Sequence, residues 1–133
     1  MTVLESLPLQ LAKPAQEVYT FLANLANHEQ IMPAQVEQFK SEGDTCQYTI
    51  KGTGTVYLKW AKQESPSLLV LEPNGKIPFP FSVHWLLEET SSESCKVMVK
   101  MEADLNPILK MMAQKPLQNF INLQIDGLKK VYG

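Results

Sequence analysis

The sequence lacks the features that would point to a nucleic-acid or membrane partner. Lys and Arg together number 12 against 14 Asp and Glu, so the net charge is −2 and the pI is near 5.7. Nucleic-acid-binding domains usually carry a basic face, so we expect no nucleic-acid partner. No stretch approaches the roughly 20 apolar residues that span a bilayer, and Met1 to Leu11 alternates instead of forming an apolar leader. We therefore expect a soluble, cytoplasmic protein without stable membrane insertion.

Cysteine and histidine are scarce, with two of each. Cys46 and Cys95 lie far apart and have no CxxC spacing, which favours two buried small side chains over a disulfide. With only His28 and His84 available, a zinc site would have to gather scattered ligands. No serine or cysteine has a recognisable base beside it in a motif. The sequence therefore predicts no metal and no cofactor, and it leaves any catalytic residues unknown.

What the chain does contain is enough apolar sequence for one core. Of its 133 residues, 44% are hydrophobic and 20% are charged, a balance typical of globular proteins. A domain of this length can bury a substantial core without disulfides or metals. The sequence shows no repeats, low-complexity tracts or linkers, so we predict a single domain over residues 1–133.

The first half of the chain predicts a strand, two short helices and a series of strands. Residues 3–11 alternate in polarity around three leucines, and Pro14 is well placed to begin a helix that continues to about residue 24. A break at residues 27–29 precedes a short helical turn that ends before Pro33. Strands follow at 35–40, 46–50, 55–62 and 68–71, and each is followed by a turn, at 42–44, 52–54, 64–67 and 73–76 respectively.

Two more strands and a long helix complete the chain. Asn106 and Pro107 form a good helix start, and an apolar stripe follows at helical spacing from Leu117 to Val131. Pro116 would cost about 3 kcal/mol inside a helix, so we expect a kink or a break between two helices there. The inward rows of the two strands are Phe79, Phe81, Val83, Trp85 and Leu87, and Cys95, Val97, Val99, Met101 and Ala103.

Three segments of the chain are similar to those of a known superfamily. The first, Ala12–Leu22, is an alanine–proline opening followed by a helix with an aromatic residue. The second, His28–Pro33, is a short helix that ends in proline, and the third, Gln124–Tyr132, is the end of the terminal helix. With the order of elements, they resemble the START-like or SRPBCC superfamily, which includes polyketide cyclases, lipid-transfer domains and the birch-pollen allergen class.

The resemblance implies an α+β, helix-grip fold. In that fold a curved antiparallel sheet of about six to seven strands wraps around a long C-terminal helix, and two short helices follow the first strand. The resemblance also implies a hydrophobic cavity between the sheet and the helix. It carries no family-wide catalytic motif, so it predicts a pocket without naming a substrate.

The inward rows supply candidate ligand-binding residues for such a cavity. Rigid aromatic walls bind flat or acyl ligands with little loss of entropy. The same side chains could instead meet and fill a dense core, and both interpretations stay open. Met111 and Met112 suit either an adaptable pocket mouth or the core. The candidate ligand-binding residues are Trp60, Phe79, Phe81, Trp85, Met101, Leu117, Phe120 and Ile121.

Several polar or rigid positions have two interpretations each. Glu5 interrupts a row of leucines, where it is either a buried general base or, on a twisted or bulged strand, a carboxylate exposed to water. His84 falls in an outward row, whereas His28 is better placed to reach one end of a cavity. Pro78 and Pro80 remove two donors from an extended run, which indicates either a stiff lip beside the entrance or protection of a sheet edge.

Three classes of function remain open. The leading hypothesis is a carrier or sensor that binds a hydrophobic small molecule, such as a lipid, a quinone or a polyketide-like compound. A cyclase- or dehydratase-like enzyme would need titratable groups converging in the cavity, for which Glu5, Tyr48 and one histidine are candidates. A protein-interaction module would need an apolar outer face, yet that face is mixed, with Tyr57 and Lys59. The sequence therefore favours binding over catalysis and leaves the ligand and the oligomeric state unknown.

Overall fold

The structure is a computed structural model that describes residues 1–51, 54–75 and 79–132. The turns expected at 52–54 and 73–76, and Pro78, fall partly or wholly outside these ranges. In chain order the elements are β1 (Thr2–Glu5), β2 (Leu9–Leu11), α1 (Ala15–Ala23), the 3₁₀ helix η1 (Leu25–Ile31), β3 (Val36–Glu42), β4 (Thr45–Ile50), β5 (Gly54–Glu64), β6 (Leu68–Pro73), β7 (Phe81–Ser91), β8 (Ser94–Ala103) and α2 (Pro107–Tyr132).

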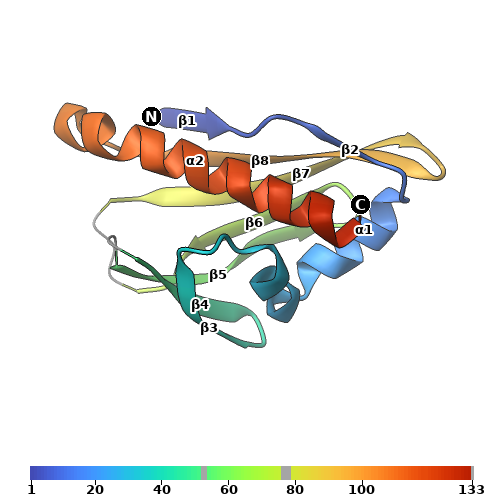
Figure 1. Cartoon of the computed structure of the whole chain (residues 1–133), viewed down its shortest axis with the longest axis horizontal. Helices are drawn as coiled ribbons and strands as arrows, with labels where there is room; N and C mark the ends of the chain where they lie inside the picture. Colours follow the sequence, from blue (N-terminus) through green and yellow to red (C-terminus); the bar gives the residue numbers. More distant parts are fainter. Residues whose placement is uncertain (52–53, 76–78, 133) are drawn as a thin grey trace.

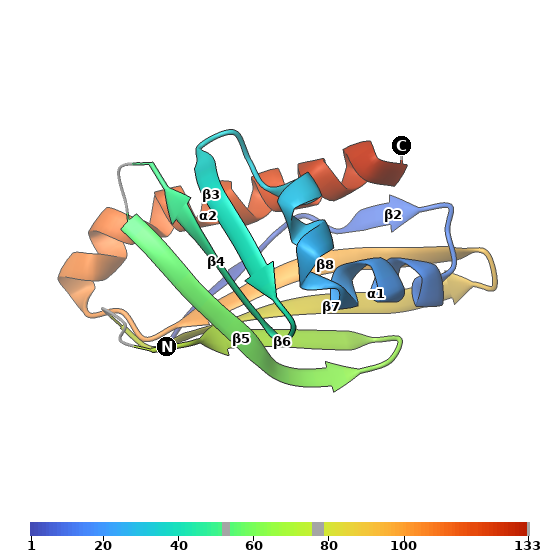
Figure 2. The same ribbon diagram turned by 90° about the horizontal axis from the view of Figure 1, so that it is seen from below.

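The strands form one antiparallel sheet of eight strands in the order β1-β8-β7-β6-β5-β4-β3, with β2 also paired to β8. The sheet curves, and α2 lies across one of its faces (Figure 1). Helices α1 and η1 close the end at which α2 finishes, so the C-terminus lies beside α1 (Figures 1 and 2). This arrangement confirms the predicted α+β class and the grip of a curved sheet on a long terminal helix.

The predicted first strand is two strands, which is why the sheet has eight strands instead of seven. β1 ends at Glu5, opposite Lys100, and β2 resumes at Leu9, opposite Val97. The bulge between them turns Ser6 inward, where its hydroxyl accepts a hydrogen bond from the Val99 N–H at 2.9 Å. An extra residue in one strand shifts the alternation of its side chains. Leu7, expected on the inner face, is therefore 78% exposed.

The first helical segment divides earlier than the sequence indicates. α1 ends at Ala23, and Asn24 caps the start of η1 by accepting the Ala26 N–H at 3.1 Å. The break is therefore at Asn24, because an asparagine side chain is a favoured cap, and not at residues 27–29. The helical turn itself ends before Pro33, as predicted.

α2 is one continuous helix, so of the two alternatives at Pro116, a kink or a break, the break is wrong. A proline in a helix leaves the carbonyl four residues earlier without its partner. That residue is Met112, which is 71% exposed, so water can reach its carbonyl. Met111 is 86% exposed, so neither methionine is part of the core. Among the helices of the described ranges, none combines the length and apolarity that crossing a bilayer requires.

The inward row of β8 forms the centre of the core, as its alternation predicts. Cys95, Val97, Val99 and Ala103 are fully buried, and Met101 nearly so. The cysteines are both free and buried, which confirms that they act as small apolar side chains. The buried residues that α2 contributes to this core are Ile121, Ile125 and Leu128.

Candidate functional site

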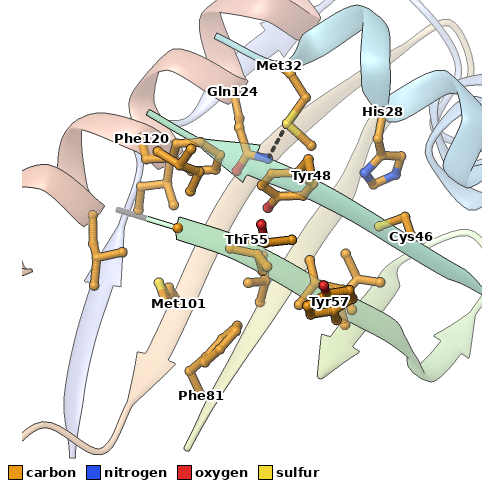
Figure 3. A pocket seen from close by; sticks show the side chains of 18 of the residues that line it. His28, Met32, Cys46, Tyr48, Thr55, Tyr57, Phe81, Met101, Phe120 and Gln124 are labelled. Atoms are coloured by element: carbon orange, nitrogen blue, oxygen red, sulfur yellow. Dashed lines mark hydrogen bonds between the residues drawn. The ribbon is translucent and has the colours of Figure 1, made fainter. Parts of the chain in front are cut away.

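A pocket of about 190 Å³ lies between α2 and the inner face of the sheet (Figure 3). Its walls come from η1, from strands β4 to β8 and from the middle of α2. The residues that line it are His28, Met32, Cys46, Tyr48, Ile50, Gly54, Thr55, Val56, Tyr57, Leu58, Leu71, Phe79, Phe81, Val83, Trp85, Met101, Leu117, Phe120, Ile121 and Gln124.

Seven of the eight candidate residues belong to this lining, and Trp60 does not. Trp60 is half-buried and packs edge-on against His28, with the ring centroids 6.0 Å apart. It therefore contacts a lining residue without being part of the lining itself. The other seven, which the structure brings together, are Phe79, Phe81, Trp85, Met101, Leu117, Phe120 and Ile121. Their contact with a ligand stays a prediction.

Sequence reasoning missed part of the lining, including Cys46 and Gln124, although each gave a signal. Cys46 alternates along β4 with Tyr48, which was already a candidate titratable group of the cavity, and both are 5% exposed. Gln124 interrupts the apolar stripe of α2, so a polar side chain occupies an inward position. Its amide Nε2 lies 3.8 Å from the Met32 sulfur, which is a weak acceptor (Figure 3).

Two groups of aromatic rings contribute to the lining of the pocket. Tyr48 is stacked on Phe120, with ring centroids 6.1 Å apart and planes at 11°. Phe39 stacks on Tyr48 from the other side at 6.0 Å, outside the lining. Phe79 and Phe81 contact one another at 5.8 Å. Rings in contact restrict each other's motion, so each group presents a stiff apolar surface to the pocket.

His28 is a neutral, fixed group at the η1 end of the pocket. Its side chain is buried, and Nε2 lies 2.7 Å from the Leu22 carbonyl oxygen. Because a carbonyl only accepts, Nε2 must carry the proton, which leaves Nδ1 as an acceptor in the neutral ring. Burial lowers the pKa of His28 to about 4, against the opposing effect of the Leu22 hydrogen bond. At neutral pH the ring therefore carries no charge.

The two acidic groups on β4 are also held in their neutral forms. Burial raises the pKa of the Cys46 thiol to about 11. Burial likewise raises the pKa of the Tyr48 phenol, with a smaller contribution from Cys46. Neither a thiolate nor a phenolate is therefore available at neutral pH, and Cys46 is not an activated nucleophile.

Trp85 is a lining residue that carries a buried donor. Its side chain is 0% exposed and belongs to the lining. Within the described ranges, its indole Nε1 is the one buried side-chain nitrogen or oxygen that has no hydrogen-bond partner. An unsatisfied buried N–H costs on the order of 1–3 kcal/mol, so this position is unusual in a native core.

Comparison with solved structures shows which fold these residues build. Norcoclaurine synthase from Thalictrum flavum superposes with a TM-score of 0.78 at 13% identity, covering 98% of this chain and 85% of that chain. The protein XoxI from Bacillus cereus superposes with a TM-score of 0.79 at 10% identity, covering 99% of this chain and 96% of that chain. One comparison structure has two domains, the ARO/CYC protein BexL of the BE-7585A biosynthetic pathway. It superposes with a TM-score of 0.67 at 15% identity, covering 97% of this chain and 47% of that chain.

The chain has the SRPBCC-like, helix-grip fold. The sequence itself matches no family model and no curated protein. At these identities the likeness concerns the fold, because side chains that determine a substrate are not shared by fold alone.

Glu5 lies outside the pocket of this helix-grip fold. It is exposed at the end of β1, just before the bulge at Ser6. Its backbone carbonyl accepts a hydrogen bond from the Gln118 side-chain amide of α2 at 2.8 Å. The interpretation of Glu5 as a buried base is therefore wrong, and the alternative of a bulged, wet position is confirmed.

A serine, a histidine and a glutamate meet on the outer face of the sheet. The Oγ of Ser82 lies 2.8 Å from Nε2 of His84, and Oε2 of Glu102 lies 3.5 Å from the same nitrogen. In a Ser–His–acid relay, the acid bonds the opposite ring nitrogen. This cluster therefore lacks the geometry of a catalytic triad, and His84 faces away from the pocket as expected.

Pro80 stands directly before β7, and Pro78 lies outside the described residues. β7 pairs with β6 on one side and β8 on the other, so it is not an edge strand. β7 pairs with β6 only from Val83 to Leu86, however, so Pro80 lies beyond that pairing and both alternatives for it stay open. Its carbonyl accepts the Asp104 N–H at 2.9 Å, which fixes the run beside two lining residues, Phe79 and Phe81.

Proposed function

We propose that this protein binds a small hydrophobic ligand, such as a lipid, quinone or polyketide-like molecule, between the sheet and α2. One observation carries the proposal: the described lining holds no Lys, Asp or Glu and is dominated by apolar and aromatic side chains. A concave apolar pocket with a few polar groups is the usual form of a small-molecule site.

The volume of the pocket limits the size of the enclosed group. A dry apolar cavity of about 150 Å³ accommodates benzene. A pocket of about 190 Å³ therefore suits one ring with a short substituent, or the end of a longer molecule. A long acyl chain would have to extend beyond the enclosed space.

Binding is better supported than a cyclase-like reaction. The fold is shared with a synthase and with an aromatase/cyclase domain, which supports a cyclase-like role as the second candidate. Proton transfer, however, is efficient when the pKa of the catalytic group lies near the working pH. His28 has a pKa of about 4 and Cys46 of about 11, so both are poorly matched to neutral conditions.

A ligand panel measured by thermal unfolding tests the proposal. Single-ring ketones, small quinones and medium-chain alcohols are each added to the protein, and the melting temperature is recorded. A ligand at about 100 times its Kd stabilises the folded state by about 2.7 kcal/mol, which corresponds to roughly 10 °C for a domain of this size.

Two variants of β7 make the test specific for the pocket. Val83 lies in the lining, so Val83→Phe places a ring in the enclosed space and should abolish the shift. Leu86 lies on the same strand outside the lining, so Leu86→Phe should keep the shift. The proposal fails if no compound stabilises the wild type, or if Val83→Phe responds as the wild type does.

A further inference from the structure

We infer that the pocket selects a compact, neutral ligand carrying a carbonyl or hydroxyl oxygen, and that this oxygen accepts a hydrogen bond from the Trp85 indole N–H. The inference rests on the proposed function, because it names the chemistry of the ligand in the same pocket. It starts from the one buried side-chain nitrogen or oxygen that has no hydrogen-bond partner among the described residues.

The Trp85 indole nitrogen is a donor without a partner. It belongs to a side chain that is 0% exposed, in the middle of β7, and that lines the pocket. An indole N–H can only donate, so an acceptor atom must complete it. Hydrocarbon cannot supply that atom, whereas a carbonyl or hydroxyl oxygen can. The pocket is therefore complementary to an apolar molecule with at least one acceptor.

The charge of the lining excludes an ionised acceptor. The chain has no arginine, and no lysine belongs to the described lining. His28, whose ring meets Trp85 edge-on at 6.0 Å, donates its only proton to Leu22 and stays neutral. A carboxylate buried here would lose its hydration without gaining a cationic partner, which is strongly unfavourable. A fatty acid anion is therefore a poor match, and a ketone, quinone, phenol or alcohol is a good one.

Three compounds of nearly the same shape separate these chemistries. Cumene presents a branched hydrocarbon on a benzene ring, acetophenone replaces part of that branch by a carbonyl, and benzoate replaces it by a carboxylate. Each is titrated into ¹⁵N-labelled protein at pH 7. The two tryptophan indole N–H signals are assigned with Trp60→Phe, which removes one of them.

The expected result has two parts. The Trp85 indole proton moves downfield with acetophenone and not with cumene, because only the ketone accepts its hydrogen bond. The ratio of the acetophenone affinity to the cumene affinity falls about tenfold in Trp85→Phe, since the variant leaves a buried carbonyl unpaired. Trp60→Phe, outside the lining, keeps the wild-type ratio.

The outcomes distinguish the inference from the proposed function. If cumene and acetophenone both bind but the ratio is the same in Trp85→Phe and the indole proton does not move, the pocket binds ligands without the assigned hydrogen bond. If benzoate binds as tightly as acetophenone, the selection for neutral ligands is wrong. If none of the three perturbs any residue of the pocket, the proposed function fails as well. Should Trp85→Phe not fold, the indole signal of the wild type decides.

Discussion

At the scale of single residues, burial determines what the pocket groups can do. His28, Cys46 and Tyr48 are all titratable, and all three are held neutral because the surrounding apolar side chains disfavour their charged forms. Their role at neutral pH is therefore to pack and to hydrogen-bond. The same desolvation makes the stability of the protein depend on pH.

His28 should make the folded state less stable in mild acid. Its pKa is 6.5 in the unfolded chain and about 4 in the folded protein, so the unfolded chain binds the proton more readily between these values. The free energy of unfolding should fall as the pH drops from about 6.5 toward 4, by on the order of 3 kcal/mol. Urea unfolding across this range measures the effect.

Replacing each histidine separates its contribution. His28→Gln keeps a donor for the Leu22 carbonyl and removes the titration, so the variant should show a much flatter pH dependence. His84→Gln is the matched control. Burial lowers the pKa of His84 as well, but His84 is only half-buried on the outer face, so this variant should keep most of the wild-type pH dependence. An unchanged pH dependence in His28→Gln would show that His28 is not held neutral by the fold.

The sequence predicted apolar site residues better than polar ones. Alternation along β7 placed Phe81 and Trp85 inward, because side chains of a strand point to opposite faces in turn. Trp60 obeys the same alternation in β5, yet it packs against His28 of a 3₁₀ helix and does not belong to the lining. This contact depends on how η1 docks, and no local pattern encodes it.

At the scale of elements, the contact between η1 and α2 sets one end of the pocket. A Cβ placed on Gly127 would lie 2.5 Å from the Ile31 carbonyl oxygen and 2.8 Å from its Cα. The two backbones therefore meet at a distance that only glycine permits. Because His28 lies in η1 and Gln124 in α2, this contact also brings these two lining residues to the same pocket.

Gly127→Ala should destabilise the protein although alanine is the better helix former. Alanine gains up to about 1 kcal/mol from helix propensity, whereas the clash with Ile31 forces the backbones apart. We expect a net loss of about 2 kcal/mol in urea unfolding. Asn119→Ala, at an exposed position of the same helix, should be neutral or slightly stabilising. A Gly127→Ala protein as stable as the wild type would contradict the close contact.

Periodicity predicted the elements but not their interruptions. The apolar stripe identified α2. The bulge at Ser6, in contrast, showed in the sequence only as a polar residue, Glu5, that interrupts a row of leucines. The bulge depends on a hydrogen bond to Val99, more than 90 residues away, which no local pattern contains. Continuity through Pro116 likewise depends on the exposure of the preceding turn.

At the scale of the whole molecule, the order of elements predicted the fold, and packing determined the pocket. A curved sheet around one long helix encloses more space near β4 to β7 than its side chains fill, leaving about 190 Å³. The sequence could not decide between this pocket and a filled core, because the same aromatic residues serve both. A pocket differs from a filled core by the volume that the side chains leave unoccupied, and this volume is determined only when all the elements are packed together.

The most direct measurement is a native mass spectrum of the protein as purified and after incubation with the ligand panel, with solvent extraction of whatever is bound. The wild type should carry one neutral apolar adduct on the 15.0 kDa chain, and Val83→Phe should carry none. A wild-type chain that stays bare under both conditions, indistinguishable from Val83→Phe, would contradict a ligand-binding pocket between the sheet and α2.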